Sequence, residues 1–330
     1  MLSRVWPAES VEPRALLEQQ CGVLSRQQAI RVGLPPTVID NRLRSGRWQR
    51  LQQGVYATFT GTPSREALLW SALLRAGPSA ALSHQTAAEL HGITDKPSSL
   101  IHITVAAAQR IAPIGGVVLH HSRSLGITTR PIASPPRTRV EDTVLDLTQS
   151  AVSFDDAFGW LCRAVGRRLT TAERLRAAME SRTRVRWRSE LSAGLGDVSV
   201  GVHSPLERRY LTNVERAHGL PAARRQAMIV IGGHRRYVDN LYEEALLAVE
   251  LDGLAAHPPE QRWADNHRDN ELAGAGLLTL HYNWHDVTDG ACAVAVEVAS
   301  LLTMRGSVVK PRSCGPGCSV VSEAVRRLGG

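Results

Sequence analysis

Residues 234–253, HRRYVDNLYEEALLAVELDG, contain the pattern that decides the fold of the C-terminal part of the chain. Two apolar runs separated by a pair of glutamates predict two strands joined by a short turn. Asp239 lies inside the first run, and Glu250 and Asp252 stand at the end of the second. Glu250 and Asp252 share a face because they are two residues apart in a strand, and Asp239 can meet Glu250 if the strands are adjacent. The pattern therefore predicts acidic side chains that converge on one sheet.

The segments on either side predict a mixed α/β sandwich. Their periodicity and capping signals predict a helix over 204–219, a strand over 224–231, the two strands above, a helix over 263–276, a strand over 277–284 and a helix over 291–304. This order, α-β-β-β-α-β-α, predicts one domain over residues 200–303.

The acidic residues suggest a site for a divalent cation. Glu207, in the first turns of the helix before the sheet, could supply a further carboxylate. Carboxylates that are forced together repel each other, and a bound divalent cation neutralises them. A site rich in oxygen suits Mg²⁺ or Mn²⁺, which can organise water and stabilise the charge of a phosphodiester transition state. The alternative is a degenerate core that serves only as a docking module.

The N-terminal segment, residues 14–60, predicts three short helices followed by a hairpin. Ser25 is a candidate N-cap for the second helix, and Pro35 and Pro36 open the third. Gly54 lies in a tight turn between two short strands. A helix-turn-helix followed by a hairpin is the pattern of a winged helix, whose second helix enters a major groove of DNA.

The charge of this segment favours a polyanionic partner. Residues 1–60 carry eight arginines against four acidic residues, half of the net charge of +8 of the chain. The alternative is an ordinary solvated surface. The candidate DNA-binding residues are Asn41, Arg42, Arg44, Arg47 and Arg50.

The middle of the chain and its C-terminal tail show no catalytic pattern. Residues 61–195 predict an α+β domain with histidines at 84, 91, 102, 120 and 121, whose spacing matches no structural zinc motif. Surface or hydrogen-bonded core histidines are the favoured interpretation. Cys314 and Cys318 supply only two metal ligands, so residues 304–330 are predicted to be a flexible Gly/Pro/Cys tail, with metal binding or a disulfide as alternatives.

The composition excludes several classes of protein. With 330 residues, 43% of them hydrophobic and 21% charged, the chain is expected to be globular and multidomain. No apolar run is long enough for a transmembrane helix, and the N-terminus lacks the apolar core of a secretory signal. Five scattered cysteines do not suggest a disulfide framework. We therefore expect a cytoplasmic protein without a membrane partner.

The C-terminal acidic pattern resembles the PD-(D/E)XK nuclease superfamily, and more closely the domains similar to very-short-patch-repair endonucleases. The resemblance covers about residues 200–303. It rests on Glu207, Tyr237-Val238-Asp239, Glu250-Leu251-Asp252-Gly253, His257 and Asp265-x-x-Arg268-Asp269.

The resemblance implies a role for each of these residues. Asp239 and Glu250 would be the metal-binding pair, and Glu207 an additional ligand or a group that holds water. Asp252 replaces the usual lysine of the superfamily, so His257 would act as general base or acid. Arg268 would steady the scissile phosphate. His281 stands where an arginine is expected.

Residues 22–92 resemble the winged-helix domain of AbiEi-type antitoxins, in GVLSRQQAIRVGL, RLRSGRWQRLQQGVYA and ALSHQTAAELHGI. The two resemblances imply an α+β multidomain protein with a winged helix-turn-helix over 1–60, a middle domain over 61–195, a restriction-endonuclease-like α/β sandwich over 200–303 and a tail over 304–330. DNA would be the partner, with a toxin or another protein as a further one. The predicted function is a DNA-binding protein with a Mg²⁺- or Mn²⁺-dependent endonuclease domain. The alternative is a non-catalytic, antitoxin-like regulator with a degenerate nuclease domain.

Overall fold

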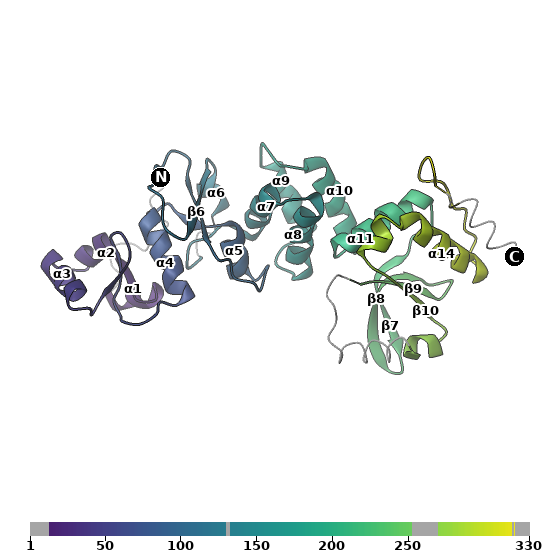
Figure 1. Cartoon of the computed structure of the whole chain (residues 1–330), viewed down its shortest axis with the longest axis horizontal. Helices are drawn as coiled ribbons and strands as arrows, with labels where there is room; N and C mark the ends of the chain where they lie inside the picture. Colours follow the sequence, from purple (N-terminus) through teal and green to yellow (C-terminus); the bar gives the residue numbers. More distant parts are fainter. Residues whose placement is uncertain (1–12, 130–132, 253–269, 319, 321–330) are drawn as a thin grey trace. The chain divides into compact units, whose positions relative to one another are not determined.

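The chain folds into two compact units, 1–186 and 187–330 (Figure 1). The computed structural model describes residues 13–129, 133–252, 270–318 and 320. The boundary between the two units falls between residues 186 and 187 of the chain, whereas the sequence placed it at 195–200. No helix in the described parts of the chain has the length and apolar character needed to cross a bilayer.

The first unit begins with three helices and a small antiparallel sheet of order β1-β3-β2. The elements are α1 (Pro13–Gln19), β1 (Val23–Ser25), α2 (Arg26–Arg31), α3 (Pro36–Arg44), β2 (Gln49–Gln52) and β3 (Val55–Ala57). The three helices and the hairpin agree with the sequence-based expectation. Strand β1 was not predicted, because three residues are too few to show an alternating pattern.

Ser25 joins β1 to α2 through a capping box. Its hydroxyl accepts a hydrogen bond from the backbone N–H of Gln28 at 3.1 Å, and the Gln28 side chain accepts one from the backbone N–H of Ser25 at 3.0 Å. Two N–H groups that the helix leaves unpaired are therefore satisfied locally. This cap fixes the start of α2.

The rest of the first unit packs helices on a second sheet of order β4-β5-β6, in which β5 and β6 are parallel. The elements are α4 (Arg65–Ala76), β4 (Ala81–Leu82), α5 (His84–His91), β5 (Ile101–Ala106), β6 (Val117–Ser122), α6 (Leu125–Thr128), α7 (Val140–Ser150), α8 (Phe154–Gly166) and α9 (Ala172–Glu180). Val23 of β1 and Val55 of β3 lie in the same apolar cluster as Trp70 of α4 and Ile103 of β5. The small sheet is therefore continuous with the core of the unit.

The second unit contains a four-stranded sheet of order β10-β9-β8-β7. Its elements are α10 (Arg188–Ser199), α11 (Pro205–Arg209), the π-helix η1 (Tyr210–Arg216), β7 (Arg224–Ile231), β8 (His234–Tyr242), β9 (Leu247–Leu251), β10 (Leu278–Tyr282), α13 (Trp284–Thr288) and α14 (Ala291–Met304). Strands β7, β8 and β9 are antiparallel neighbours, whereas β10 runs parallel to β9. The three-strand meander and the later parallel strand agree with the predicted order.

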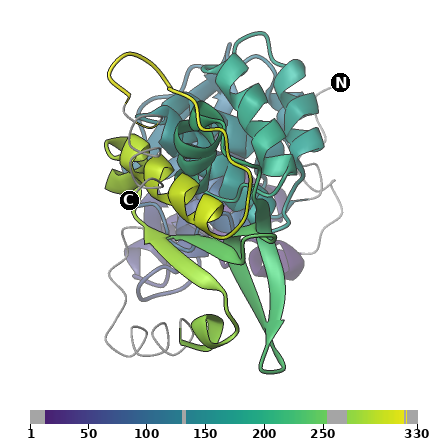
Figure 2. The same ribbon diagram turned by 90° about the vertical axis from the view of Figure 1, so that its right-hand side faces the viewer.

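Helices cover both faces of this sheet. Figure 2 shows α14 lying across one face, where Val296 of α14, Val214 of η1 and Val249 of β9 share an apolar cluster. On the other face, Leu272 in the helical residues 270–274 packs with Val238 and Ala248. The ends of β8 and β9 with their acidic residues are thus held by a core on each side.

Candidate functional site

The predicted DNA-binding residues lie together on α3 and β2. We call Asn41, Arg42, Arg44, Arg47 and Arg50 the α3–β2 surface; all but Arg42 are exposed. Helix α3 starts after Pro35 and ends at Arg44, with Ser45 as its C-cap, and Gly46 follows with φ of +69°. This left-handed turn favours glycine and returns the chain directly into β2.

Neighbouring side chains hold parts of this surface in place. The Arg42 guanidinium lies 5.0 Å from the centre of the Trp48 ring, a cation–π contact that leaves Arg42 half-buried. Arg44 donates a hydrogen bond to the Asn41 side chain at 2.5 Å. Asp40 pairs with Arg26 at 3.0 Å, and this bond, with the weaker effect of the charges of Arg44 and Arg50, lowers the pKa of its carboxyl. The local acid is therefore already paired, and the exposed arginines present net positive charge.

The predicted carboxylates of β8 and β9 do come together. The backbone N–H of Asp239 points at Glu250 Oε2 at 3.4 Å, and Asp239 Oδ2 accepts a hydrogen bond from the backbone N–H of Leu251 at 2.9 Å. Glu250 is buried. The cross-strand meeting of Asp239 and Glu250, expected from the spacing, is therefore present in the structure.

Glu207 of α11 belongs to the same region. It is buried and accepts a hydrogen bond from the backbone N–H of His203 at 2.9 Å. Burial, with a smaller contribution from the charge of Asp239, raises the pKa of Glu207 to about 7. Gln226 of β7 donates to Asp239 Oδ1 at 2.9 Å and also hydrogen-bonds Glu207. The sequence analysis did not single out Gln226. Its polar side chain within β7, the strand that pairs with β8, could have indicated a partner for Asp239.

Asp252 follows β9, and its Oδ2 lies 3.0 Å from Nδ1 of His281 on β10. These two residues are the departures from the superfamily pattern noted above, and the parallel pairing of β9 with β10 brings them together. His257 and Arg268 lie outside the described residues.

Two groups of three or more His, Cys, Asp or Glu side chains, among the residues the structure describes, are close enough to share a metal ion. They are His84, His102 and His120, and His218, Cys292, Cys314 and Cys318. Neither contains a carboxylate. In this arrangement Asp239 and Glu250 lie in no group of three ligands within 4.8 Å among the described residues. A pair of carboxylates still suits Mg²⁺, because this ion commonly keeps several waters and takes one or two carboxylates.

The histidines of the first group form a hydrogen-bonded stack. The rings of His84 and His120 lie 3.6 Å apart between centroids, and a nitrogen of His102 lies 3.0 Å from one of His120. His84 Nδ1 lies 3.0 Å from the Ser83 hydroxyl. Burial, with a smaller contribution from the charges of neighbouring histidines, lowers the pKa of His84 to about 4 and that of His120 to about 3. The stack is therefore neutral at neutral pH.

The stability of the protein is expected to fall as the pH drops from about 6.5 toward 4. In this range the histidines of the unfolded chain bind protons that the folded stack excludes. The contribution of the neutral stack to the free energy of unfolding is therefore complete above about pH 6.5 and is lost progressively below it. Each ring contributes at most about 1.4 kcal/mol per pH unit, and His120 less because it is partly solvated. Urea denaturation of the wild type and a His84→Gln/His120→Gln variant across this range measures the difference. His121→Gln, on an exposed residue of β6, is the control; equal pH dependence in wild type and double variant contradicts the prediction.

The first unit starts with the helices and wing typical of a winged-helix domain, and the second is an α/β sandwich with buried acids on its sheet. Residues 12–58 match the model of the family described as "Transcriptional regulator, AbiEi antitoxin". No similar sequence was found among curated proteins. The N-terminal resemblance is thereby confirmed over residues 12–58, and the C-terminal one stays a prediction.

Proposed function

We propose that the protein is a DNA-binding regulator that inserts α3 into the major groove. The main observation in support of this function is the exposed, basic α3–β2 surface on a winged-helix arrangement. The family that matches residues 12–58 is described as a transcriptional regulator and antitoxin, which supports the same function. A toxin or another protein as a second partner, and a cytoplasmic location, are parts of this proposal.

Selection from a random pool of duplex DNA tests this function. The full chain is expected to enrich a common site and to protect guanine N7 atoms within it from methylation, because N7 faces the major groove. An Asn41→Ala variant is expected to change the enriched bases, whereas Arg14→Ala on α1 is a control with an exposed arginine. A pool that stays random, or protection confined to the minor groove, contradicts insertion of α3.

We propose as a second candidate that the C-terminal unit is a metal-dependent DNA endonuclease. The favouring observation is the contact of Asp239 with Glu250, with Glu207 linked to Asp239 through Gln226. The order of helix, three antiparallel strands, helix and parallel strand supports the predicted PD-(D/E)XK resemblance. Hydrolysis of DNA by this unit would make the winged helix its targeting arm.

The residues have distinct roles in this candidate activity. Asp239 and Glu250 would hold Mg²⁺ or Mn²⁺, which supplies electrostatic stabilisation of the phosphodiester transition state. Glu207, with its raised pKa, would hold a water or bind the ion when deprotonated. His281, which stands where an arginine is expected and lies 3.0 Å from Asp252, would move a proton. His257 and Arg268 keep their proposed roles as proton carrier and phosphate ligand.

A further inference from the structure

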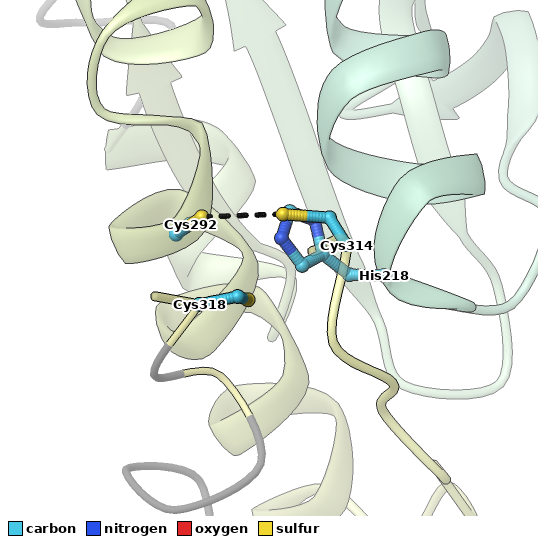
Figure 3. Close-up of side chains that lie close together, drawn as sticks. All are labelled: His218, Cys292, Cys314 and Cys318. Carbon is cyan, nitrogen blue, oxygen red and sulfur yellow. Dashed lines mark hydrogen bonds between the residues drawn. The ribbon is translucent and has the colours of Figure 1, made fainter. Parts of the chain in front are cut away.

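Four side chains from distant parts of the sequence meet at one end of the second unit. His218 follows η1, Cys292 lies in the first turn of α14, and Cys314 and Cys318 belong to the segment after α14 (Figure 3). Their ligand atoms, one nitrogen and three sulfurs, all lie within 4.8 Å of one another. The predicted flexible tail thus contributes two members of an assembled cluster.

The spacing of the sulfurs fits a shared metal better than a disulfide. Sγ of Cys292 and Sγ of Cys314 are 3.7 Å apart, whereas a disulfide needs about 2.0 Å. A tetrahedral zinc ion with Zn–S bonds of about 2.3 Å places its thiolates roughly 3.8 Å apart. None of the described cysteines forms a disulfide.

His218 is oriented as a metal ligand. Its ring is completely buried, and Nδ1 lies 3.0 Å from the carbonyl oxygen of Val214, so Nδ1 carries the proton and donates it. Nε2 therefore presents a lone pair, and within the described residues it has no hydrogen-bond partner. A ligating histidine commonly has its other nitrogen fixed by a backbone carbonyl in this manner. The buried lone pair of His218 lies close to three cysteine sulfurs, and a bound cation would satisfy all four groups.

The backbone brings the two tail cysteines to the histidine. The N–H of Arg312 donates to the carbonyl oxygen of His218 at 2.8 Å, which anchors the segment immediately before Cys314. Gly317, with φ of +81°, and a bond from the N–H of Cys318 to Gly315 O at 3.2 Å form a tight turn. The turn points Cys318 back toward Cys314, as a metal-binding loop requires. Beyond it, Val320 is fully buried in the apolar core of the unit.

We propose that His218, Cys292, Cys314 and Cys318 form a structural Zn²⁺ site that fastens the tail to η1 and α14. Three thiolates and one imidazole are a preferred donor set for zinc, and hard cations such as Mg²⁺ prefer oxygen. Four protein ligands close the coordination shell, so the ion stabilises the fold and leaves no open position for a substrate. This site shares no residue with the α3–β2 surface or with the carboxylates on β8 and β9.

Metal analysis of the purified full chain tests the site. Protein produced with zinc is expected to hold about one Zn²⁺ per chain, and a Cys314→Ser/Cys318→Ser variant less than about a tenth of that. Cys21→Ser, on a partly buried cysteine of the first unit, is the matched control and keeps its zinc. Replacement with Co²⁺ is expected to give the visible bands and thiolate charge-transfer absorption of a tetrahedral site, which the double variant lacks.

A second measurement covers the case in which the double variant does not fold. Chelator treatment of the wild type is expected to lower its melting temperature and to open residues 305–318 to proteolysis, and added Zn²⁺ restores both. The proposal is overturned if folded wild type contains no zinc and shows no Co²⁺ spectrum. It is also overturned if mass spectrometry finds Cys292 and Cys314 joined in a disulfide whose reduction, and not chelation, loosens the tail.

Discussion

Replacing Arg44, Arg47 and Arg50 together with alanine is expected to weaken binding of duplex DNA by about two orders of magnitude. All three side chains are exposed on the α3–β2 surface, where they can contact phosphates beside a helix in the major groove. Arg42 is left intact because its guanidinium packs on Trp48 and its loss would disturb the domain. Fluorescence anisotropy with labelled duplex measures the affinity of the full chain.

The control must remove the same charge from elsewhere in the first unit. Arg110, Arg123 and Arg184 are exposed and lie outside residues 13–60, so their triple alanine variant has the same net charge as the α3–β2 variant. We expect its affinity to change by less than about threefold, because distant charges are screened. Equal losses in the two variants would mean that net charge alone drives binding.

Metal-dependent nicking of plasmid DNA is expected to fall by at least about a hundredfold in an Asp239→Asn/Glu250→Gln variant. The amides keep the shape of the side chains and remove the negative charges that a divalent cation needs. Wild type and variant are compared with Mg²⁺, with Mn²⁺ and with EDTA. A Glu243→Gln/Glu244→Gln variant, altered in the exposed turn between β8 and β9, is the matched control and retains activity.

Two further outcomes separate the candidate functions. Absence of nicking by wild type that still binds DNA favours the regulator, and the carboxylates are then remnants of a nuclease core. Nicking that survives the double variant places the activity elsewhere or in a contaminant. If nicking occurs, His281→Gln tests the proton-transfer role of the pair with Asp252, and a changed pH profile is the expected result.

Local signals explain which parts of the fold were predictable. Ser25 was predicted as the N-cap of α2, and the structure confirms it and adds a capping box with Gln28. The two apolar runs around Asp239 and Glu250 predicted the two strands, and their antiparallel pairing as neighbours brings these residues together. Strand β1 was missed, since its three residues depend on pairing with β3 and carry little pattern of their own.

The sites assembled from distant residues were harder to predict. Spacing rules find ligands that lie in one loop, whereas His218 and Cys292 join Cys314 and Cys318 only after α14 packs beside η1. Gln226 was missed for a similar reason, because its importance comes from pairing across strands with Asp239. Asn41 and Arg44, the exposed candidates on α3, were found because a short amphipathic helix displays its polar face directly in the sequence.

The salt dependence of DNA binding tests the role of the α3–β2 surface most directly. For the full chain, log K should fall linearly with log salt concentration, with a slope of about −0.9 for each phosphate contact. Removing Arg44, Arg47 and Arg50 should make the slope shallower by up to about 2.7, while the matched triple variant keeps the wild-type slope. An unchanged slope in the α3–β2 variant would contradict DNA binding through α3 and the wing.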